Sequence, residues 1–196
     1  MFTGIIEEVG AVTSIQKEGG NIHFTIASAL SAGFKIDQSV AHNGCCLTVV
    51  AQNEQEHVVT AIQETLLKTN LGTWHVGSKI NIERCMQLGG RLDGHMVQGH
   101  VDCVGTCTEV LDENGSWRFT FEHPDSFVTV EKGSITVNGV SLTVVDARAN
   151  QFSVCIIPYT YEHTTFHQIA QGDRVNLEFD IIGKYVQQYM KAYENR

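Results

Sequence analysis

An internal repeat constrains this chain more than any other feature of its sequence. When residues 1–95 are placed over residues 96–190 at a constant offset of 95, similar blocks coincide in four places without a gap. The first two blocks pair MFTGIIEEVG with MVQGHVDCVG and SVAHNGCCLTVV with SITVNGVSLTVV. The other two pair TAIQETLLKTN with CIIPYTYEHTT and VGSKINIE with QGDRVNLE. Four blocks at a single offset predict two homologous domains in tandem.

Each half has the pattern of a β domain. The segments NIHFTIAS, CCLTVVAQ, HVVTAIQ and SKINIER are short and rich in β-branched and aromatic residues, and three of them return in the second half. Asn43-Gly44 and Asn138-Gly139 stand directly before a strand at matching places, which predicts turns with positive φ. A small set of strands closed into a barrel has no free edge. We therefore predict an all-β fold of two tandem, homologous, six-stranded antiparallel Greek-key closed barrels.

Helices are expected at three places. ETLLKTN and YTYEHTTF each follow a strand and predict a short helix. In the tail, Ile182, Val186, Tyr189, Met190 and Tyr193 recur at three- and four-residue steps, which predicts a C-terminal α-helix with one apolar face. This helix could pack on its own domain or form a subunit contact. The expected divisions are one barrel at 1–88, a second at 96–183, a linker at about 84–95, and an oligomerisation helix at 184–196.

Composition argues against several classes of partner. The chain has 13 Lys and Arg against 22 Asp and Glu, for a formal net charge of -9, whereas nucleic acid binding depends on clustered cations. No apolar run approaches the ~20 residues of a membrane span. The first residues, MFTGIIEEVG, lack the basic start of a signal peptide. We therefore expect no nucleic acid or membrane partner, a cytoplasmic location, and six cysteines present as thiols.

The NG-containing block places polar side chains at equivalent points of both halves. The offset equates Cys46 with Ser141 and Thr48 with Thr143. Residues two apart on a strand share a face, so each barrel would present a nucleophilic or hydrogen-bonding group beside a hydroxyl. This indicates two equivalent small-molecule pockets. The alternative is cross-strand pairing of threonines on a solvated face.

The halves also differ at informative positions. His100 stands where the first half has Ile5, and Lys132 stands where it has Asp37. If both pockets bind the same ligand, these changes make one of them basic and leave the other neutral. Such asymmetry is what two identical molecules need if they react as donor and acceptor. The alternatives are a structural histidine and a solvated lysine.

A metal site is not expected. His95, His100, Cys103 and Cys107 have residue types that bind zinc. Residues 96–105 are, however, expected to lie on a strand, where the side chains of His100 and Cys103 would point to opposite faces.

The segments MFTGII, SVAHNGCCLTV, GGRLDGHMVQGHVD and NGVSLTV, at these spacings, resemble the alpha-type riboflavin synthase family over essentially the whole chain. The resemblance implies that each barrel binds one 6,7-dimethyl-8-(1-D-ribityl)lumazine. Two such molecules then dismutate into riboflavin and 5-amino-6-(D-ribitylamino)uracil without metal or organic cofactor. It also implies a homotrimer held by the C-terminal helices, with the active site between the N-terminal barrel of one subunit and the C-terminal barrel of another.

The resemblance further implies particular site residues. The catalytic set would be His100, Ser141, Cys46, Lys132 and Thr143. The N-barrel pocket would comprise Gly4, Ile5, Ile6, Ser39, Cys46, Leu47, Thr48, Thr60, Ala61, Ile62, Gln63, Glu64 and Thr65. The C-barrel pocket would comprise Gly99, His100, Val101, Lys132, Ser141, Leu142, Thr143, Cys155, Ile156, Ile157, Pro158, Tyr159 and Thr160. The segment from Tyr159 to Tyr161 departs from the expected acidic Glu-Thr-Leu type.

Two other functions compete with the synthase. A non-catalytic antenna protein could use the same barrels to hold a lumazine or flavin, but the polar residues Cys46, His100, Ser141 and Thr143 favour an enzyme. A flavin-binding reductase module would need a nicotinamide domain, and no GxGxxG follows a strand. The sequence leaves open which barrel holds the donor, and whether Cys46 or Ser141 bonds covalently to the ring.

Overall fold

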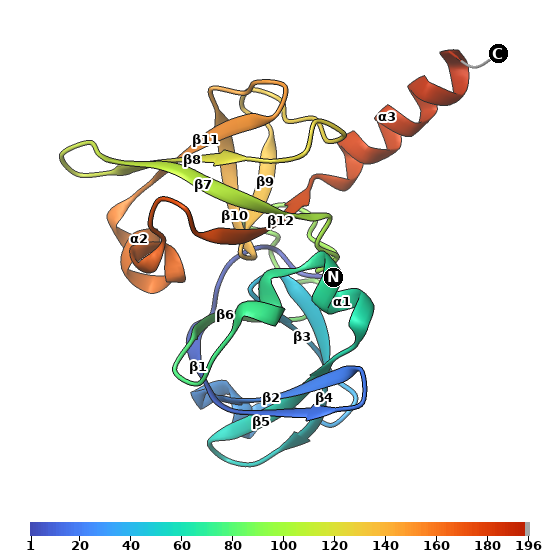
Figure 1. Ribbon diagram of the computed structural model, residues 1–196, viewed down its shortest axis with the longest axis vertical. Helices are drawn as coiled ribbons and strands as arrows, with labels where there is room; N and C mark the ends of the chain where they lie inside the picture. Colours follow the sequence, from blue (N-terminus) through green and yellow to red (C-terminus); the bar gives the residue numbers. More distant parts are fainter. Residues whose placement is uncertain (195–196) are drawn as a thin grey trace.

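The computed structural model describes residues 1–194 and consists of two closed antiparallel barrels followed by a helix (Figure 1). The strand order is β1-β2-β5-β4-β3-β6 in the first barrel, and the second repeats it with β7, β8, β11, β10, β9 and β12. The first barrel comprises β1 (Glu8–Glu18), β2 (Asn21–Ala27), β3 (Ser39–His42), β4 (Cys45–Gln52), β5 (Glu56–Ala61) and β6 (Lys79–Arg84). The second comprises β7 (Cys103–Asp112), β8 (Trp117–Glu122), β9 (Ser134–Val137), β10 (Val140–Val145), β11 (Gln151–Ile156) and β12 (Arg174–Phe179). The predicted fold class is confirmed.

Short helices cap the same end of both barrels. α1 (Gln63–Lys68) and the 3₁₀ helix η2 (Asn70–Thr73) follow β5, while α2 (Pro158–His163) and η3 (Thr165–Gln168) follow β11. A further 3₁₀ helix, η1 (Ala29–Gly33), follows β2. The helices expected at ETLLKTN and YTYEHTTF are therefore confirmed.

The turns before β4 and β10 have the conformation that their residues favour. Asn43 and Gly44 have φ values of 45° and 77°, and Asn138 and Gly139 have 47° and 80°. Two consecutive positive φ values suit the right-handed twist of a two-residue hairpin. The turn fixes the register of β3 and β4, in which Ala41 faces Cys46. It thereby determines which β4 side chains enter the barrel.

Strand alternation divides β4 into an inner and an outer row. Cys45, Leu47 and Val49 are buried in the core of the first barrel. Cys46 is half-buried and Thr48 is exposed, so both lie on the outer face. The prediction that Cys46 and Thr48 share a face is confirmed, and the polar row lies on the outside of a barrel whose interior is filled by side chains.

Asparagine side chains join the two barrels reciprocally. Asn81 in β6 donates to the carbonyl of Asn138 at 2.9 Å, and Asn176 in β12 donates to the carbonyl of Asn43 at 2.9 Å. Gly44 and Gly139 also meet closely, since a Cβ on Gly44 would lie 2.7 Å from the Gly139 nitrogen. Exchanging contacts between equivalent positions gives the pair of barrels approximate two-fold symmetry.

The connection between the barrels differs from the expected strand. Residues 96–105 do not form one strand: Val97 makes an isolated bridge with Phe2, and β7 begins at Cys103. The reason is that this segment pairs with the equivalent start of the chain, through Phe2 N–H to Val97 O at 2.7 Å and Val97 N–H to Phe2 O at 3.1 Å. The expectation that residues 96–105 form a strand, which put His100 and Cys103 on opposite faces, is therefore wrong.

The C-terminal helix α3 (Ile181–Glu194) extends away from the second barrel (Figure 1). It starts three residues before the expected helix boundary at 184, and residues 195 and 196 of that expected segment lie outside the described part of the chain. Lys184 binds Asp102 at 2.9 Å, which fixes the first turn to the barrel. No residue of α3 is buried. None of the helices within residues 1–194 is long and apolar enough to span a membrane.

A buried histidine pair distinguishes the core of the first barrel. His42 and His57 are both 0% exposed, with their Nε2 atoms 2.8 Å apart. His42 Nδ1 lies 3.1 Å from the Val40 carbonyl, which can only accept, so His42 donates there and accepts at Nε2. His57 then donates from Nε2 and accepts at Nδ1 from Ser31, 2.8 Å away. Both imidazoles are neutral in this arrangement.

This pair predicts acid sensitivity. Burial, together with repulsion from His57, lowers the pKa of His42 to about 3, and burial lowers the pKa of His57 to about 4. In the unfolded chain both accept protons near pH ~6.5. As the pH falls from there toward 4, only the unfolded state gains protons at these sites. The free energy of unfolding should therefore fall by up to ~1.4 kcal/mol per pH unit for each histidine.

The equivalent positions of the second barrel supply a matched variant. They hold Val137 and Phe152, so His42→Val combined with His57→Phe copies a core that the same fold already uses. Urea unfolding at pH 7.5 and pH 5.0 should show a markedly smaller loss of stability in this double variant than in the parent chain. An equal loss in both proteins would contradict the account.

Candidate functional site

In each barrel, two neighbouring strands pair over only part of their length. β5 pairs with β4 from Val49 onward, in the pairs Val49–Val59, Ala51–Val58 and Gln52–His57. The first half of β4 instead pairs with β3 on its other side. Cys46–Thr48 therefore have no strand partner on the side of β5, and the region between them and the end of β5 is here called the N slot.

The second barrel repeats this pairing pattern. β11 pairs with β10 only at Val144 and Val145, while the preceding residues of β10 pair with β9. The resulting C slot lies between Ser141–Thr143 and the end of β11. The two slots are therefore equivalent by the offset of the repeat.

The segments that border the two slots are exchanged between the barrels. Cys46 N–H donates to the carbonyl of Gly99 at 2.8 Å, and Ser141 N–H donates to the carbonyl of Gly4 at 2.8 Å. Val101 packs against the core of the first barrel, and Ile6 packs against that of the second. The expected grouping put residues 4–6 in the N-barrel pocket and residues 99–101 in the C-barrel pocket. In the structure, residues 99–101 instead border the N slot, and residues 4–6 border the C slot.

The close approach explains why glycine occupies both contact points. A Cβ on Gly99 would lie 2.7 Å from the Cys46 Cβ, and one on Gly4 would lie 2.5 Å from the Ser141 Cβ. Both glycines also have a φ of 78°. Any other residue would be strained and would push the segment away from the slot.

The exchanged hydrogen bond also sets the direction of the neighbouring backbone. Cys46 N–H points away from β3 toward Gly99, whereas Val49 N–H points the other way, to the Gln38 carbonyl at 2.9 Å. Peptide groups alternate along a strand, so the N–H and C=O of Thr48 point into the N slot. The same pattern directs those of Thr143 into the C slot. A flat heterocycle with adjacent donor and acceptor groups could pair with such an edge.

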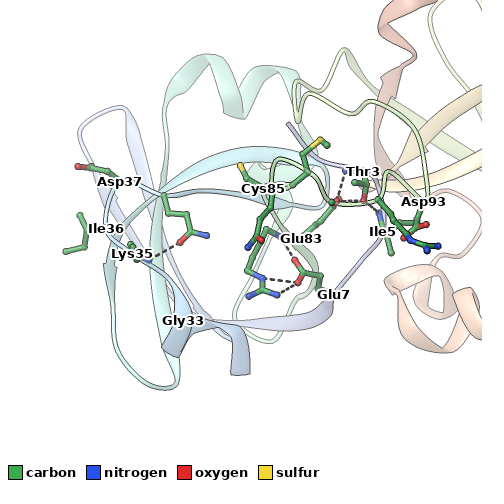
Figure 2. A pocket seen from close by; sticks show the side chains of 16 residues that line it. Thr3, Ile5, Glu7, Gly33, Lys35, Ile36, Asp37, Glu83, Cys85 and Asp93 are labelled. Carbon is green, nitrogen blue, oxygen red and sulfur yellow. Dashed lines mark hydrogen bonds and ion pairs between the residues drawn. The ribbon is translucent and has the colours of Figure 1, made fainter.

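Two buried carboxylates hold the exchanged segments. Glu83, in β6, accepts from Thr3 N–H at 2.6 Å, Thr3 Oγ1 at 2.7 Å and Gly4 N–H at 3.0 Å. Figure 2 shows Thr3 and Glu83 directed toward each other. Glu178, in β12, accepts from the N–H groups of Gln98, Gly99 and His100 at 2.7, 2.9 and 2.9 Å. Burial raises the pKa of both carboxyl groups, and these hydrogen bonds oppose the rise.

Ser141 has a basic partner that sequence reasoning did not select. His95 Nδ1 lies 2.7 Å from Ser141 Oγ. Burial lowers the pKa of His95, so its imidazole is neutral near pH 7 and can accept the serine proton. His95 precedes the first repeated residue and has no counterpart in the first half, so the repeat gave no reason to choose it. The signal that could have found it is the paired motif Gly94-His95 and Gly99-His100.

The N slot presents a different group at the same position. Cys46 is half-buried, and burial raises the pKa of its thiol. A protonated thiol is a weak nucleophile. The two slots therefore offer different chemistry on matched strands, as the sequence comparison of Cys46 with Ser141 indicated.

The remaining predicted site residues differ in their exposure and in their distance from the slots. Lys132 is exposed, with its ammonium 3.9 Å from the Glu131 carboxylate, so the described contacts do not bring it to Ser141. Ser39 faces Thr48 across β3 and β4. Leu47, Ala61 and Ile156 point into the cores, so a ligand could reach them only through their backbone. Leu142 and Thr60 are half-buried. Besides Thr48 and Lys132, the exposed predicted residues are Ile5, His100, Thr143, Cys155, Ile62, Gln63, Glu64, Ile157, Pro158 and Tyr159.

The helix following each slot differs in chemistry. α1 has Glu64 and Thr65, whereas α2 has Tyr159 and Thr160. Tyr159 stacks on His163 with ring centroids 4.1 Å apart. The two threonines are equivalent and half-buried.

A cavity of about 860 Å³ adjoins the C slot through Ile5 and the connecting segment. Figure 2 shows its lining, with Lys35, Ile36 and Asp37 on one side and Ile5 and Asp93 on the other. Next along the chain, Gly94 contacts Ser141, since a Cβ on Gly94 would lie 3.1 Å from the Ser141 Oγ. The linker therefore forms part of the slot's surroundings rather than a free tether.

No group of three potential metal ligands gathers within residues 1–194. The six cysteines are all free thiols.

Comparison with known proteins finds the same duplication. Residues 3–85 and 98–180 each match the lumazine binding domain. Proteins named riboflavin synthase are similar over nearly the whole chain: one from Mycobacterium bovis is 42% identical, covering 98% of this chain and 99% of its own length. Another from Actinobacillus pleuropneumoniae is 39% identical, covering 97% and 90%, and one from Bacillus subtilis is 38% identical, covering 100% and 93%.

Solved structures show the same fold. LumP complexed with 6,7-dimethyl-8-(1'-D-ribityl)lumazine has a TM-score of 0.83 at 20% identity, and LumP complexed with riboflavin has 0.85 at 21%. Both comparisons cover 91% of this chain and 99% of the other. Two matched domains and full-length relatives at this identity show that the chain belongs to the riboflavin synthase family of lumazine-binding proteins.

Proposed function

We propose that this enzyme is a transferase that dismutates two molecules of 6,7-dimethyl-8-(1-D-ribityl)lumazine. One molecule gives a four-carbon unit to the other, which yields riboflavin and 5-amino-6-(D-ribitylamino)uracil. The observation that carries the proposal is the pair of equivalent slots with unlike side chains, Cys46 in one and Ser141 bound to His95 in the other. Two identical molecules can then occupy similar sites and undergo different chemistry.

The slots offer hydrogen-bonding groups that complement those of the substrate. The peptide edges at Thr48 and Thr143 can pair with the pyrimidinedione, which has neighbouring donors and acceptors. The threonine hydroxyls are available to the ribityl chain. Holding both rings in fixed positions replaces a bimolecular encounter with an oriented one.

The reaction needs a base and stabilisation of a carbanion. Loss of a proton from the activated methyl group of the donor lumazine places negative charge in its ring. His100 is our candidate base in the N slot, whereas in the C slot the neutral His95 can take the proton of Ser141 as that hydroxyl adds to a ring. Ser141 is the better activated of the two possible nucleophiles, because Cys46 stays protonated. The proposal requires no metal or organic cofactor, since both products derive from two identical substrates.

We further propose a cytoplasmic homotrimer whose contacts include α3. Its exposed apolar residues are Ile182, Tyr185, Val186, Tyr189, Met190 and Tyr193. A cavity of about 570 Å³ lies between this helix and residues 127–134. An exposed apolar stripe of six residues on an otherwise acidic chain favours a contact with another protein chain. Assembly would also bring the N slot of one subunit to the C slot of another, where the exposed Lys132 could reach the reacting pair.

Purified chain incubated with only 6,7-dimethyl-8-(1-D-ribityl)lumazine should release riboflavin, measured by absorbance and chromatography. Ser141→Ala should slow turnover by about 10²-fold or more if activated hydroxyl chemistry contributes as general base catalysis does elsewhere. Thr108→Ala, in β7, a strand that borders neither slot, is the control. Tight binding of fluorescent ligand without turnover would favour the antenna protein instead.

The assembly proposal is tested by altering the exposed stripe of α3. Val186→Glu places a charge on the stripe, and Gln188→Glu places the same charge on an exposed polar position as its control. Sedimentation should show a species near three times 21.7 kDa for the parent and for Gln188→Glu, and a smaller species for Val186→Glu. Truncation after Lys184 should reduce turnover far more than ligand binding. A monomeric variant with unchanged turnover would contradict the proposal.

A further inference from the structure

The two buried glutamates connect each barrel to the slot of the other. Glu178 belongs to β12 of the second barrel, and its carboxylate binds three consecutive N–H groups, from Gln98 to His100. The carbonyl of Gly99, in the middle of that segment, accepts from Cys46 in the first barrel. The path from Glu178 to the N slot therefore consists of two successive hydrogen-bonded contacts.

Glu83 makes the equivalent connection in the opposite direction, from the first barrel to the C slot. It belongs to β6 of the first barrel and binds Thr3 and Gly4. The carbonyl of Gly4 accepts from Ser141 in the second barrel. Glu83 and Glu178 are 4% and 2% exposed, so neither carboxylate can take water in place of these donors without opening the structure.

We propose that Glu83 and Glu178 are positioning residues that act on the slot of the opposite barrel. Glu178 sets the N slot through Gly99 and His100, and Glu83 sets the C slot through Gly4. The crossed connection follows from the exchanged segments, and its importance for turnover rests on the proposed function.

A charge-neutral isostere is the direct test. Glu→Gln keeps the size of the side chain but replaces one acceptor oxygen with a donor that faces a backbone N–H. The segment held by that residue should then separate from its slot more often, while the fold keeps the other segment in place. Because the two glutamates are equivalent by the repeat, each variant is the control for the other.

Cysteine alkylation can report each slot separately. Cys46 is the native reporter of the N slot, and Ser141→Cys supplies a thiol at the equivalent point of the C slot. Cys45 and Cys107, buried in the two cores, report global unfolding within the same sample. Iodoacetamide labelling under native conditions, followed by peptide mass analysis, measures all four thiols.

The expected pattern is crossed. Glu178→Gln should speed alkylation of Cys46 by about tenfold, the effect of losing a hydrogen bond to a charged group, and leave the thiol at position 141 unchanged. Glu83→Gln should do the reverse. The core thiols should stay unreactive in both. Equal acceleration of both reporters, or a larger effect within the variant's own barrel, would overturn the proposal.

A milder change covers the case in which a glutamine variant does not fold. Thr3→Ala removes only the hydroxyl that donates to Glu83 at 2.7 Å. It should speed alkylation at position 141 and leave the alkylation rate of Cys46 unchanged. Equal acceleration at both positions would overturn the proposed role of Glu83. For Glu178, the shorter side chain of Glu178→Asp should speed alkylation of Cys46 selectively. The absence of a selective change would overturn the proposed role of Glu178.

Ligand binding separates this proposal from the proposed function. In a fluorescence titration with 6,7-dimethyl-8-(1-D-ribityl)lumazine, Glu178→Gln should weaken the ligand that protects Cys46 from alkylation and spare the other. A crossed alkylation pattern in a chain that binds lumazine but never forms riboflavin would support the positioning roles while refuting the dismutation. Turnover with uncrossed alkylation would do the opposite.

Discussion

Carboxylates buried at the ends of β6 and β12 determine where the chemically important segments lie. The start of the chain and residues 98–100 leave their backbone N–H groups outside the barrel ladders, and such groups are costly to bury without partners. Glu83 and Glu178 supply acceptors for them within each barrel. Once held, each segment offers a carbonyl to the opposite barrel, and the slot borders follow from that contact.

The duplication provides two similar sites, and a few substitutions make them chemically different. Ser141 binds His95, which has no equivalent in the first half, while Cys46 occupies the matching place with its pKa raised by burial. The cores diverged as well, since the His42–His57 pair of the first barrel corresponds to Val137 and Phe152 in the second. The backbone framework stayed constant, because the exchanged glycines and the anchoring glutamates occur in both halves.

Much of the fold followed from periodicity. Alternation along the strand predicted that Cys46 and Thr48 share a face, and Asn43-Gly44 predicted a turn with positive φ, because both signals are local. The exchange of Gly4 and Gly99 could not be predicted in this way. A repeat says which residues are equivalent, but a segment packed on its own barrel and one packed on the other have the same local sequence.

The candidate site was predicted in part for the same reason. The pairs Cys46–Ser141 and Thr48–Thr143 were visible at the offset, whereas His95 was not, because it lies before the repeated residues. At the position of Lys132, the sequence comparison showed only that the first half has Asp37 instead. Its distance from Ser141 depends on the tertiary arrangement of loops, which composition and spacing do not encode.

A crystal structure of the chain with 6,7-dimethyl-8-(1-D-ribityl)lumazine bound would test the exchanged arrangement most directly. The account predicts one ligand contacting Cys46–Thr48 together with Gly99–Val101. It predicts a second contacting Ser141–Thr143 together with Gly4–Ile6. A ligand held by Cys46 and Gly4 of the same barrel, with residues 99–101 against the other ligand, would contradict it.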